Sequence, residues 1–288
     1  MGKIKKFIKI AAIVFTVLVI VGMAVQIYLL RGTPGRELHR NEYRQDTTYT
    51  STPTILVPGW GGNTVTYNKL INYYQDHHYA QKTLTIWVTP WGSIHTDGTL
   101  NPKEKNPMIQ VLFDWNYDST FHPQVQQLIR VLTYLQTTYH LKRVNIIAHS
   151  YGGTEFMHAF MDSPQLRNNL QLHKVIFLGV PVEESLAARL RYRYHLIKHS
   201  HDANFIRLRK QMKQWQPNYH LYIYNLMGTR RHSKRTDGEV PLIESEMLKS
   251  LLKGHPTITY HQHIYRNTSH SQLHDRTKIL NYIAKQLW

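Results

Sequence analysis

The stretch Val144-Asn-Ile-Ile-Ala-His-Ser-Tyr-Gly-Gly-Thr154 decides the fold of this chain. Residues 144–148 form an unbroken, mostly apolar run, which is typical of a strand covered on both faces in a parallel sheet. Ser150 lies in a pattern of small-x-Ser-x-Gly formed by Ala148 and Gly152, and a helical pattern begins at Thr154. A turn from strand through serine to helix needs small neighbours, and it places the hydroxyl at a helix N-terminus, where backbone amides favour developing negative charge. The stretch is typical of a nucleophile elbow; the alternative is an ordinary loop serine.

Short apolar runs alternate with longer amphipathic ones on both sides of this elbow. This alternation predicts a doubly wound, mainly parallel sheet with helices on both faces, whose active site lies beyond the carboxyl ends of the strands. The expected strands are residues 54–57, 84–88, 144–148, 175–178, 221–226 and 258–264. The expected helices are residues 65–77, 123–139, 154–162, 185–214, 243–252 and 275–287.

A second signal is Pro58-Gly-Trp-Gly-Gly62, directly after the first expected strand. A glycine loop at this place could supply a backbone amide to an oxyanion hole, so we expect the amides of Trp60 and Tyr151 to be the donors. The alternative is a phosphate-binding loop, but neither of the two common glycine patterns for phosphate is present.

The acid and the base should follow the serine in that order along the chain. Asp237 comes after a late strand, where its carboxylate can orient an imidazole. The alternatives are that Asp237-Gly238 only makes a turn, or that Glu239 or Glu244 is the acid.

The base should lie between the last strand and the last helix, and two histidines qualify. His270 is well inside this loop, and His274 lies near the helix start, so we prefer His270 and keep His274 as the alternative. We expect His149, beside the serine, to pack or form hydrogen bonds rather than act as the base.

On these motifs the chain resembles the α/β-hydrolase superfamily, and more narrowly a family of cell-surface or membrane-bound hydrolases from lactic acid bacteria and related Gram-positives. The resemblance covers residues 52–288 and includes the segments 58–62, 106–111, 148–153, 236–241 and 270–275. It implies serine hydrolase chemistry on carboxylic esters, with no cofactor and no natural substrate specified. The family usually has His-Gly where this chain has Pro58-Gly59.

The N-terminus predicts a membrane anchor. Lysines precede an apolar run at residues 10–30, which as a helix is about 30 Å long, enough to cross a bilayer. We expect an uncleaved signal anchor in residues 1–36, with the bulk of the chain outside the cytoplasm, followed by a polar stalk and linker up to residue 52 and a catalytic domain at 53–288. A signal peptide cleaved near Ala24 is the alternative.

Composition limits the remaining choices. The 288 residues contain no cysteine, which excludes a disulfide scaffold and a cysteine nucleophile. The net charge of +17 fits an anionic cell envelope, and no signature of a nucleic-acid-binding domain is present. His261 and His263 have metal-ligand spacing but lack an obvious carboxylate partner, so we expect no metal. Residues 187–213 lie where hydrolases of this fold carry a cap, and Trp60, Trp87, Trp91 and Trp115 could line an acyl pocket or pack in the core.

These observations together predict a membrane-anchored serine esterase or lipase-like hydrolase that works through Ser150, His270 and Asp237 and an acyl-enzyme. An acyltransferase with the same triad is one alternative. A catalytically idle protein of this fold that binds anionic envelope polymers is another.

Overall fold

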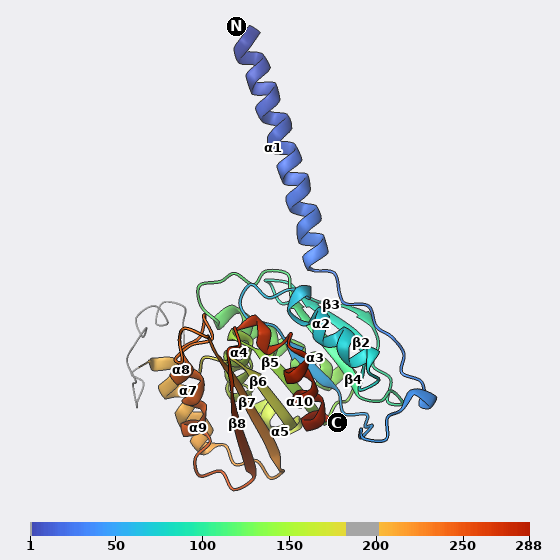
Figure 1. The fold of residues 1–288 in the computed structure, drawn as a ribbon, viewed down its shortest axis with the longest axis vertical. Helices are drawn as coiled ribbons and strands as arrows, with labels where there is room; N and C mark the ends of the chain where they lie inside the picture. Colours follow the sequence, from blue (N-terminus) through green and yellow to red (C-terminus); the bar gives the residue numbers. More distant parts are fainter. Residues whose placement is uncertain (1, 183–201) are drawn as a thin grey trace.

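The computed structural model describes residues 2–182 and 202–288, and its central element is an eight-stranded sheet (Figure 1). The strands lie in the order β3-β2-β4-β1-β5-β6-β7-β8. All neighbouring strands are parallel except β2 and β3, which are antiparallel. The strands are β1 (Thr54–Val57), β2 (Gln81–Val88), β3 (Ile94–Gly98), β4 (Pro107–Phe113), β5 (Arg143–His149), β6 (Gln171–Leu178), β7 (Leu221–Thr229) and β8 (Ile258–Arg266).

The direction of winding reverses at β1, in the middle of the sheet. From β1 the chain builds β2, β3 and β4 on one side, and then crosses to build β5 through β8 on the other. A crevice forms beyond the carboxyl ends of the strands at such a reversal. The loop after β1 and the turn after β5 meet at this point.

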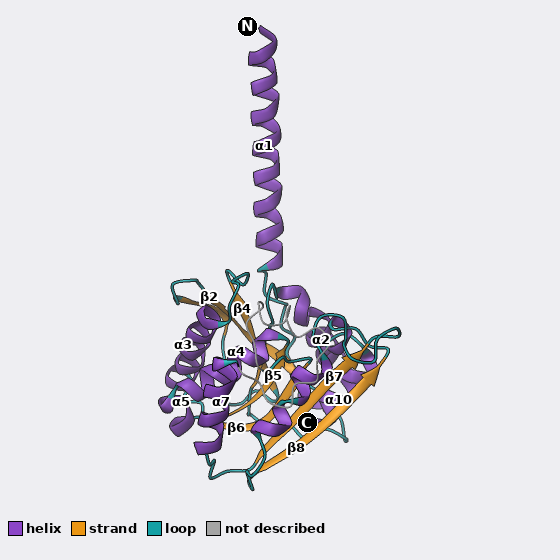
Figure 2. Ribbon diagram, turned by 90° about the vertical axis from the view of Figure 1, so that its left-hand side faces the viewer, coloured by secondary structure: helices purple, strands orange, loops and turns teal. Residues whose placement is uncertain are grey.

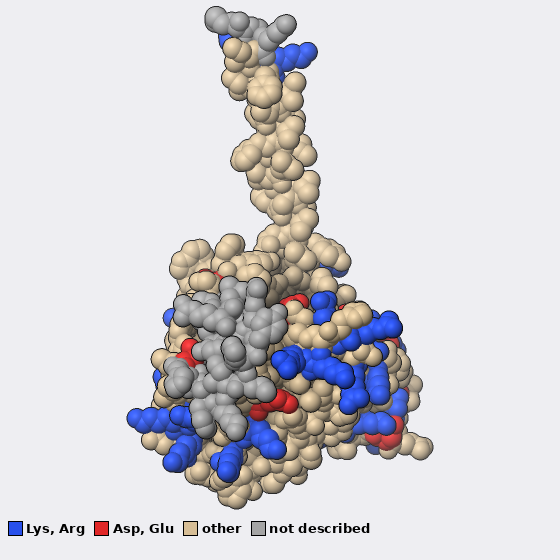
Figure 3. Space-filling view, turned by 60° about the vertical axis from the view of Figure 1, so that its left-hand side comes forward, with Lys and Arg blue, Asp and Glu red and all other residues tan. Residues whose placement is uncertain are grey.

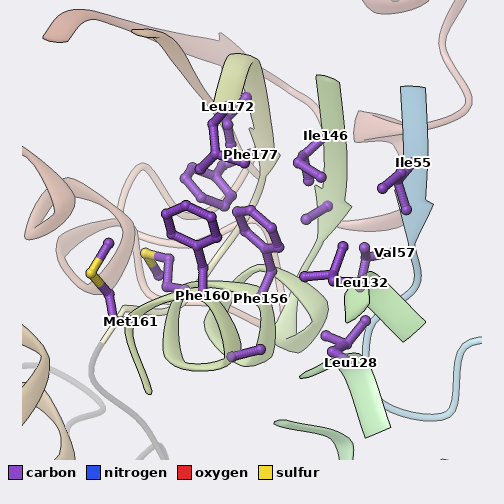
Figure 4. Close-up of a cluster of buried hydrophobic side chains, with 14 of the residues drawn as sticks. Ile55, Val57, Leu128, Leu132, Ile146, Phe156, Phe160, Met161, Leu172 and Phe177 are labelled. Atoms are coloured by element: carbon purple, nitrogen blue, oxygen red, sulfur yellow. The ribbon is translucent and has the colours of Figure 1, made fainter. Parts of the chain in front are cut away.

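Helices cover both faces of the sheet, as the sequence predicts (Figure 2). One face packs against α2 (Thr64–Asp76) and α10 (Thr277–Leu287). The other packs against α3 (His122–Thr138), α4 (Tyr151–Asp162), α7 (Ala203–Gln214) and α9 (Leu248–Leu251). Figure 4 shows part of this second core, in which Phe156 and Phe160 of α4 lie against Phe177 of β6. The short helices α5 (Pro164–Asn169) and α8 (Leu242–Glu246) complete the domain.

Two of the observed strands, β3 and β4, are absent from the sequence expectation. β4 contains Gln110, which is buried and accepts a hydrogen bond from the amide of Thr33, so a polar residue interrupts a core strand. β3 is a mostly polar edge strand. The expected helix at 243–252 is divided between α8 and α9. Of the expected helix at 185–214, residues 185–201 lie outside the described residues, and residues 203–214 form α7.

The apolar N-terminal helix α1 (Gly2–Leu29) stands out from the domain (Figure 1). Its stretch Ile4–Leu29 is 26 residues long and apolar enough to cross a membrane. α1 ends directly on the domain, where the indole nitrogen of Trp87 donates to the carbonyl of Leu30 at 2.6 Å.

The segment between α1 and β1, which we expected to be a stalk and linker, instead lies along the domain. Three glutamine side chains accept hydrogen bonds from its backbone: Gln110 from Thr33, Gln75 from Arg36 and Gln81 from Leu38. Further on, the amide of Thr48 donates to the carbonyl of Trp288 at 2.6 Å. The segment therefore does not hold the domain away from α1.

Candidate active site

Ser150 has the strained backbone that an elbow requires. It follows β5 and precedes the first residue of α4, with φ 53° and ψ −133°, a conformation that is uncommon for any residue but glycine. Its amide donates to the carbonyl of Leu178 at 2.9 Å, and its own carbonyl accepts from Gly153 at 3.0 Å. These bonds hold the turn at the carboxyl edge of the sheet.

Glycines surround Ser150 because the neighbouring chain passes too close for a side chain. A Cβ on Gly59 would lie 2.7 Å from the Cβ of Ser150, and one on Gly152 would lie 2.3 Å from the carbonyl oxygen of Pro58. A Cβ on Gly153 would meet Val180 at 2.3 Å. Gly59 and Gly152 therefore allow the close contact of the loop after β1 with the elbow, and Gly153 leaves room for Val180, which follows β6.

Asp237 and His270 form a buried pair. The Nδ1 atom of His270 lies 2.7 Å from Oδ2 of Asp237, and both side chains are almost completely buried. The other carboxylate oxygen of Asp237 accepts hydrogen bonds from the amides of Glu239 and Val240. Because the carboxylate can only accept, Nδ1 of His270 carries the proton and Nε2 is the basic nitrogen.

Gly179 joins this pair to the elbow. It directly follows Leu178, whose carbonyl accepts from Ser150, and a Cβ at position 179 would lie 2.9 Å from both Oδ2 of Asp237 and Nδ1 of His270. Gly179 has φ 58°. Ser150, Asp237 and His270, distant in the sequence, are thus brought to the carboxyl ends of β5, β7 and β8.

His149 packs against the same imidazole, as the sequence suggested. Its ring centroid lies 4.4 Å from that of His270 and 4.5 Å from that of His274. Burial lowers the pKa of His149 well below its ordinary value, and the two neighbouring histidines lower it further. A neutral ring therefore flanks His270, so His149 does not repel a positive charge that forms there.

The alternative residues occupy other positions. His274 forms its own pair with Asp275, at 2.9 Å. Glu239 is exposed, and its carboxylate lies 3.8 Å from Nε2 of His270 rather than at the Nδ1 side. Glu244 is buried within α8.

The loop after β1 carries one of the two expected oxyanion donors. Trp60 follows Gly59 in this loop, and Tyr151 is the first residue of α4; a Cβ on Gly59 would lie 3.3 Å from the amide nitrogen of Tyr151. The two amides therefore belong to segments that touch beside Ser150. The side chain of Trp60 points away to donate to the carbonyl of Asp118.

Asn116 holds this loop and was not found by sequence reasoning. Its side-chain amide donates to the carbonyl of Gly59 at 2.7 Å, and its own carbonyl accepts from Gly61 at 2.6 Å. An asparagine just after β4 would have been the signal, but β4 itself was not expected. Asn116 is buried, so these contacts are shielded from water.

The side chains of the remaining candidates make other contacts. His261 stacks on Tyr224 and His263 contacts Tyr265, and the described residues contain no group of three potential metal ligands. In the expected cap, residues 187–201 lie outside the described part of the chain, and α7 packs on α4 through Arg207 and Gln211, which contact Asp162. The tryptophans at 60, 91 and 115 are exposed at the strand ends rather than packed in the core.

Comparisons with known proteins agree with this architecture. The model of the family described as "Alpha/beta hydrolase of unknown function (DUF915)" matches residues 41–288. The product of the gene lin2722 from Listeria innocua has a similar structure, with a TM-score of 0.67, 22% identity, and coverage of 81% of this chain and 92% of that one. A candidate cell surface hydrolase from Lactobacillus plantarum WCFS1 has a TM-score of 0.64, 18% identity, and coverage of 83% and 90%. No curated protein matches the chain by sequence.

Proposed function

The chain belongs to the α/β-hydrolase family of unknown function DUF915, and on that premise we propose that it is a serine hydrolase that cleaves carboxylic esters through Ser150, His270 and Asp237. The observation that carries the proposal is the buried pair of His270 and Asp237 beside a strained serine. A buried imidazole with Nδ1 bound to a carboxylate has its other nitrogen ready to accept a proton, which is the state a general base requires.

The reaction follows from these positions. The Oγ atom of Ser150 attacks the ester carbonyl as its proton passes to Nε2 of His270, and the new C–O bond gives a tetrahedral oxyanion. The amides of Trp60 and Tyr151 stabilise this oxyanion. The bond to the leaving oxygen then breaks, and His270 returns the proton to release the alcohol. Water attacks the acyl-enzyme by the same proton transfers and releases the acid.

We propose further that α1 is a single membrane anchor, with the domain outside the cytoplasm. Its apolar stretch Ile4–Leu29 is long enough to span a bilayer, and basic residues at positions 3, 5, 6 and 9 precede the uncharged run that begins at residue 10. Carbonate extraction tests the anchor. We expect the whole chain of 34.0 kDa to stay in the membrane pellet, whereas release of a shorter soluble form would indicate a cleaved signal.

Labelling with a fluorophosphonate probe tests the chemistry. The wild-type chain should become labelled, Ser150→Ala should not, and the exposed Ser93→Ala control should label like the wild type. Failure of the wild type to react would contradict the hydrolase and favour an idle binding protein. Product analysis with added alcohols separates hydrolysis from acyl transfer.

A further inference from the structure

Exposed aromatic side chains gather at one edge of the domain. Beyond α1, the large aromatic side chains that the described residues expose are Trp60 (46% exposed), Trp91 (86%), Trp115 (52%) and Tyr117 (43%). These four residues, which we call the aromatic rim, follow the carboxyl ends of β1, β2 and β4. Tyr117 joins two of them, because its ring centroid lies 5.8 Å from Trp60 and 5.4 Å from Trp115.

The anchor helix meets the domain at this same edge. The side chain of Gln26, still within α1, contacts the carbonyl of Asp114, which directly precedes Trp115. Trp87, near the end of β2 and four residues before Trp91, donates to the carbonyl of Leu30. The end of α1 therefore lies directly beside the aromatic rim. A bilayer that α1 spans must then lie next to the rim.

The rim also continues to the candidate nucleophile. Trp60 stands in the loop whose Gly59 touches Ser150, and a Cβ on Gly61 in that loop would lie 3.4 Å from the ring of Tyr117. A continuous line of contacts thus runs from the end of α1 through Trp115, Tyr117 and Trp60 to Ser150.

Tryptophan and tyrosine are the side chains that membrane proteins concentrate at the interface between headgroups and acyl chains. We propose that the aromatic rim lies in the interface of the bilayer that α1 spans, so that Ser150 faces the leaflet and takes its acyl ester from an amphiphile of that bilayer. This inference rests on the proposed anchor and ester chemistry, and it adds the orientation of the domain and the class of substrate.

The charge distribution agrees with this orientation. In Figure 3 the length of α1 between its first lysines and the domain carries no charged side chain, and the lysines and arginines visible on the domain gather mainly on its flanks and lower part. The uncharged length of α1 therefore extends to the edge of the domain that carries the aromatic rim.

Orientation can be tested directly because the chain has no cysteine. We would introduce Ser93→Cys beside Trp91 and, as the matched control, Thr138→Cys at the end of α3 near the opposite edge. Each full-length variant is labelled with an environment-sensitive nitrobenzoxadiazole dye and reconstituted in phosphatidylcholine vesicles with added phosphatidylglycerol. We expect brominated lipids to quench the label at 93 and leave the label at 138 unquenched. Any other pattern, such as two unquenched labels from a rim that binds another protein, overturns the proposal.

The substrate class is tested with two esters. Trp91→Ala should lower the rate on a diacylglycerol embedded in the vesicles by about tenfold or more, because it removes a large anchoring ring, and should leave the rate on a water-soluble acetate ester unchanged. The exposed Ile206→Ala in α7 is the control and should change neither rate. Equal rates on the vesicle substrate for all variants would overturn the proposal. If the wild type cleaves neither ester, the ester chemistry fails, and the quenching result still decides the orientation.

Discussion

Asp237 is the residue on which the orientation of the candidate base depends. Its carboxylate binds Nδ1 of His270 and is itself held by two backbone amides, so removing its charge leaves the geometry nearly unchanged. In Asp237→Asn the amide nitrogen can donate to Nδ1, which favours the tautomer that carries its proton on Nε2. We expect kcat to fall by about 10⁴-fold with KM little changed, measured on a soluble ester.

The control for this prediction is Asp275→Asn, which disturbs the pair of Asp275 and His274 instead. We expect it to keep most of the activity. If Asp275→Asn were the damaging change and Asp237→Asn the mild one, His274 would be the base.

His158 is a buried histidine away from the candidate nucleophile, and it should make the fold sensitive to acid. It stacks on Phe121 at 4.6 Å, and burial, followed by the charges of Arg207 and His122, lowers its pKa to about 3. Below the ordinary histidine pKa the unfolded chain binds a proton that the folded chain does not, so stability falls as the pH falls. We expect His158 to account for about 2 kcal/mol of lost stability between about pH 7 and about pH 5.

Urea unfolding of the full chain in detergent at several pH values measures this effect. His158→Phe keeps a planar ring beside Phe121 and should reduce the slope of stability against pH. The exposed His261→Phe should keep the wild-type slope. Identical slopes for all three chains would show that His158 does not set the acid sensitivity.

At the scale of elements, the end of β6 packs tightly against the pair of Asp237 and His270. Gly179 has φ 58°, and a Cβ there would lie 2.9 Å from both the Asp237 carboxylate and the His270 ring. Gly179→Ala should therefore separate this pair and lower kcat/KM by about 100-fold or more. The backbone strain itself should cost about 1 kcal/mol of stability.

Gly254 gives the matched control for this substitution. It also has a positive φ, 91°, but a Cβ there would meet nothing within 4 Å. Gly254→Ala should bear a similar backbone strain and keep its activity. Ester hydrolysis and thermal unfolding of both variants separate strain from displacement, and equal activities would contradict this account.

The elements that could be predicted from sequence are those with a local pattern. β1, β5 and β7 are apolar runs, and the chain order expected for a nucleophile, an acid and a base indicated Asp237 and His270, whose side chains form a pair in the structure. β3 could not be predicted, because it is a mostly polar edge strand, and β4 was missed because Gln110 interrupts its apolar run. The role of Gln110 depends on Thr33, which is distant in sequence, and such partners leave no local pattern. Asn116 was missed for the same reason.

At the scale of the whole molecule, the positions of α1 and β1 explain the path of the intervening segment. α1 ends at the carboxyl edge of the sheet, whereas a parallel strand such as β1 begins at the amino edge. The chain must therefore cross the height of the domain before β1 can start, and it does so along buried glutamines rather than as a free stalk. The end of α1 is fixed close to the domain as a result.

The last residue of the chain completes this arrangement, and its loss should destabilise the whole domain. Trp288 is buried, lies 5.0 Å from the ring of Tyr74 and 6.5 Å from that of Tyr79, and accepts a hydrogen bond through its carbonyl from the amide of Thr48. Trp288→Ala would leave a cavity where the two ends of the domain meet α2. We expect it to lower the free energy of unfolding by about 3 kcal/mol, measured by urea unfolding in detergent.

The exposed Trp91→Ala should change stability by no more than about 0.5 kcal/mol. Because Trp288 lies away from Ser150, folded Trp288→Ala should retain wild-type kcat on a soluble ester, and a loss of activity without a loss of stability would contradict this role.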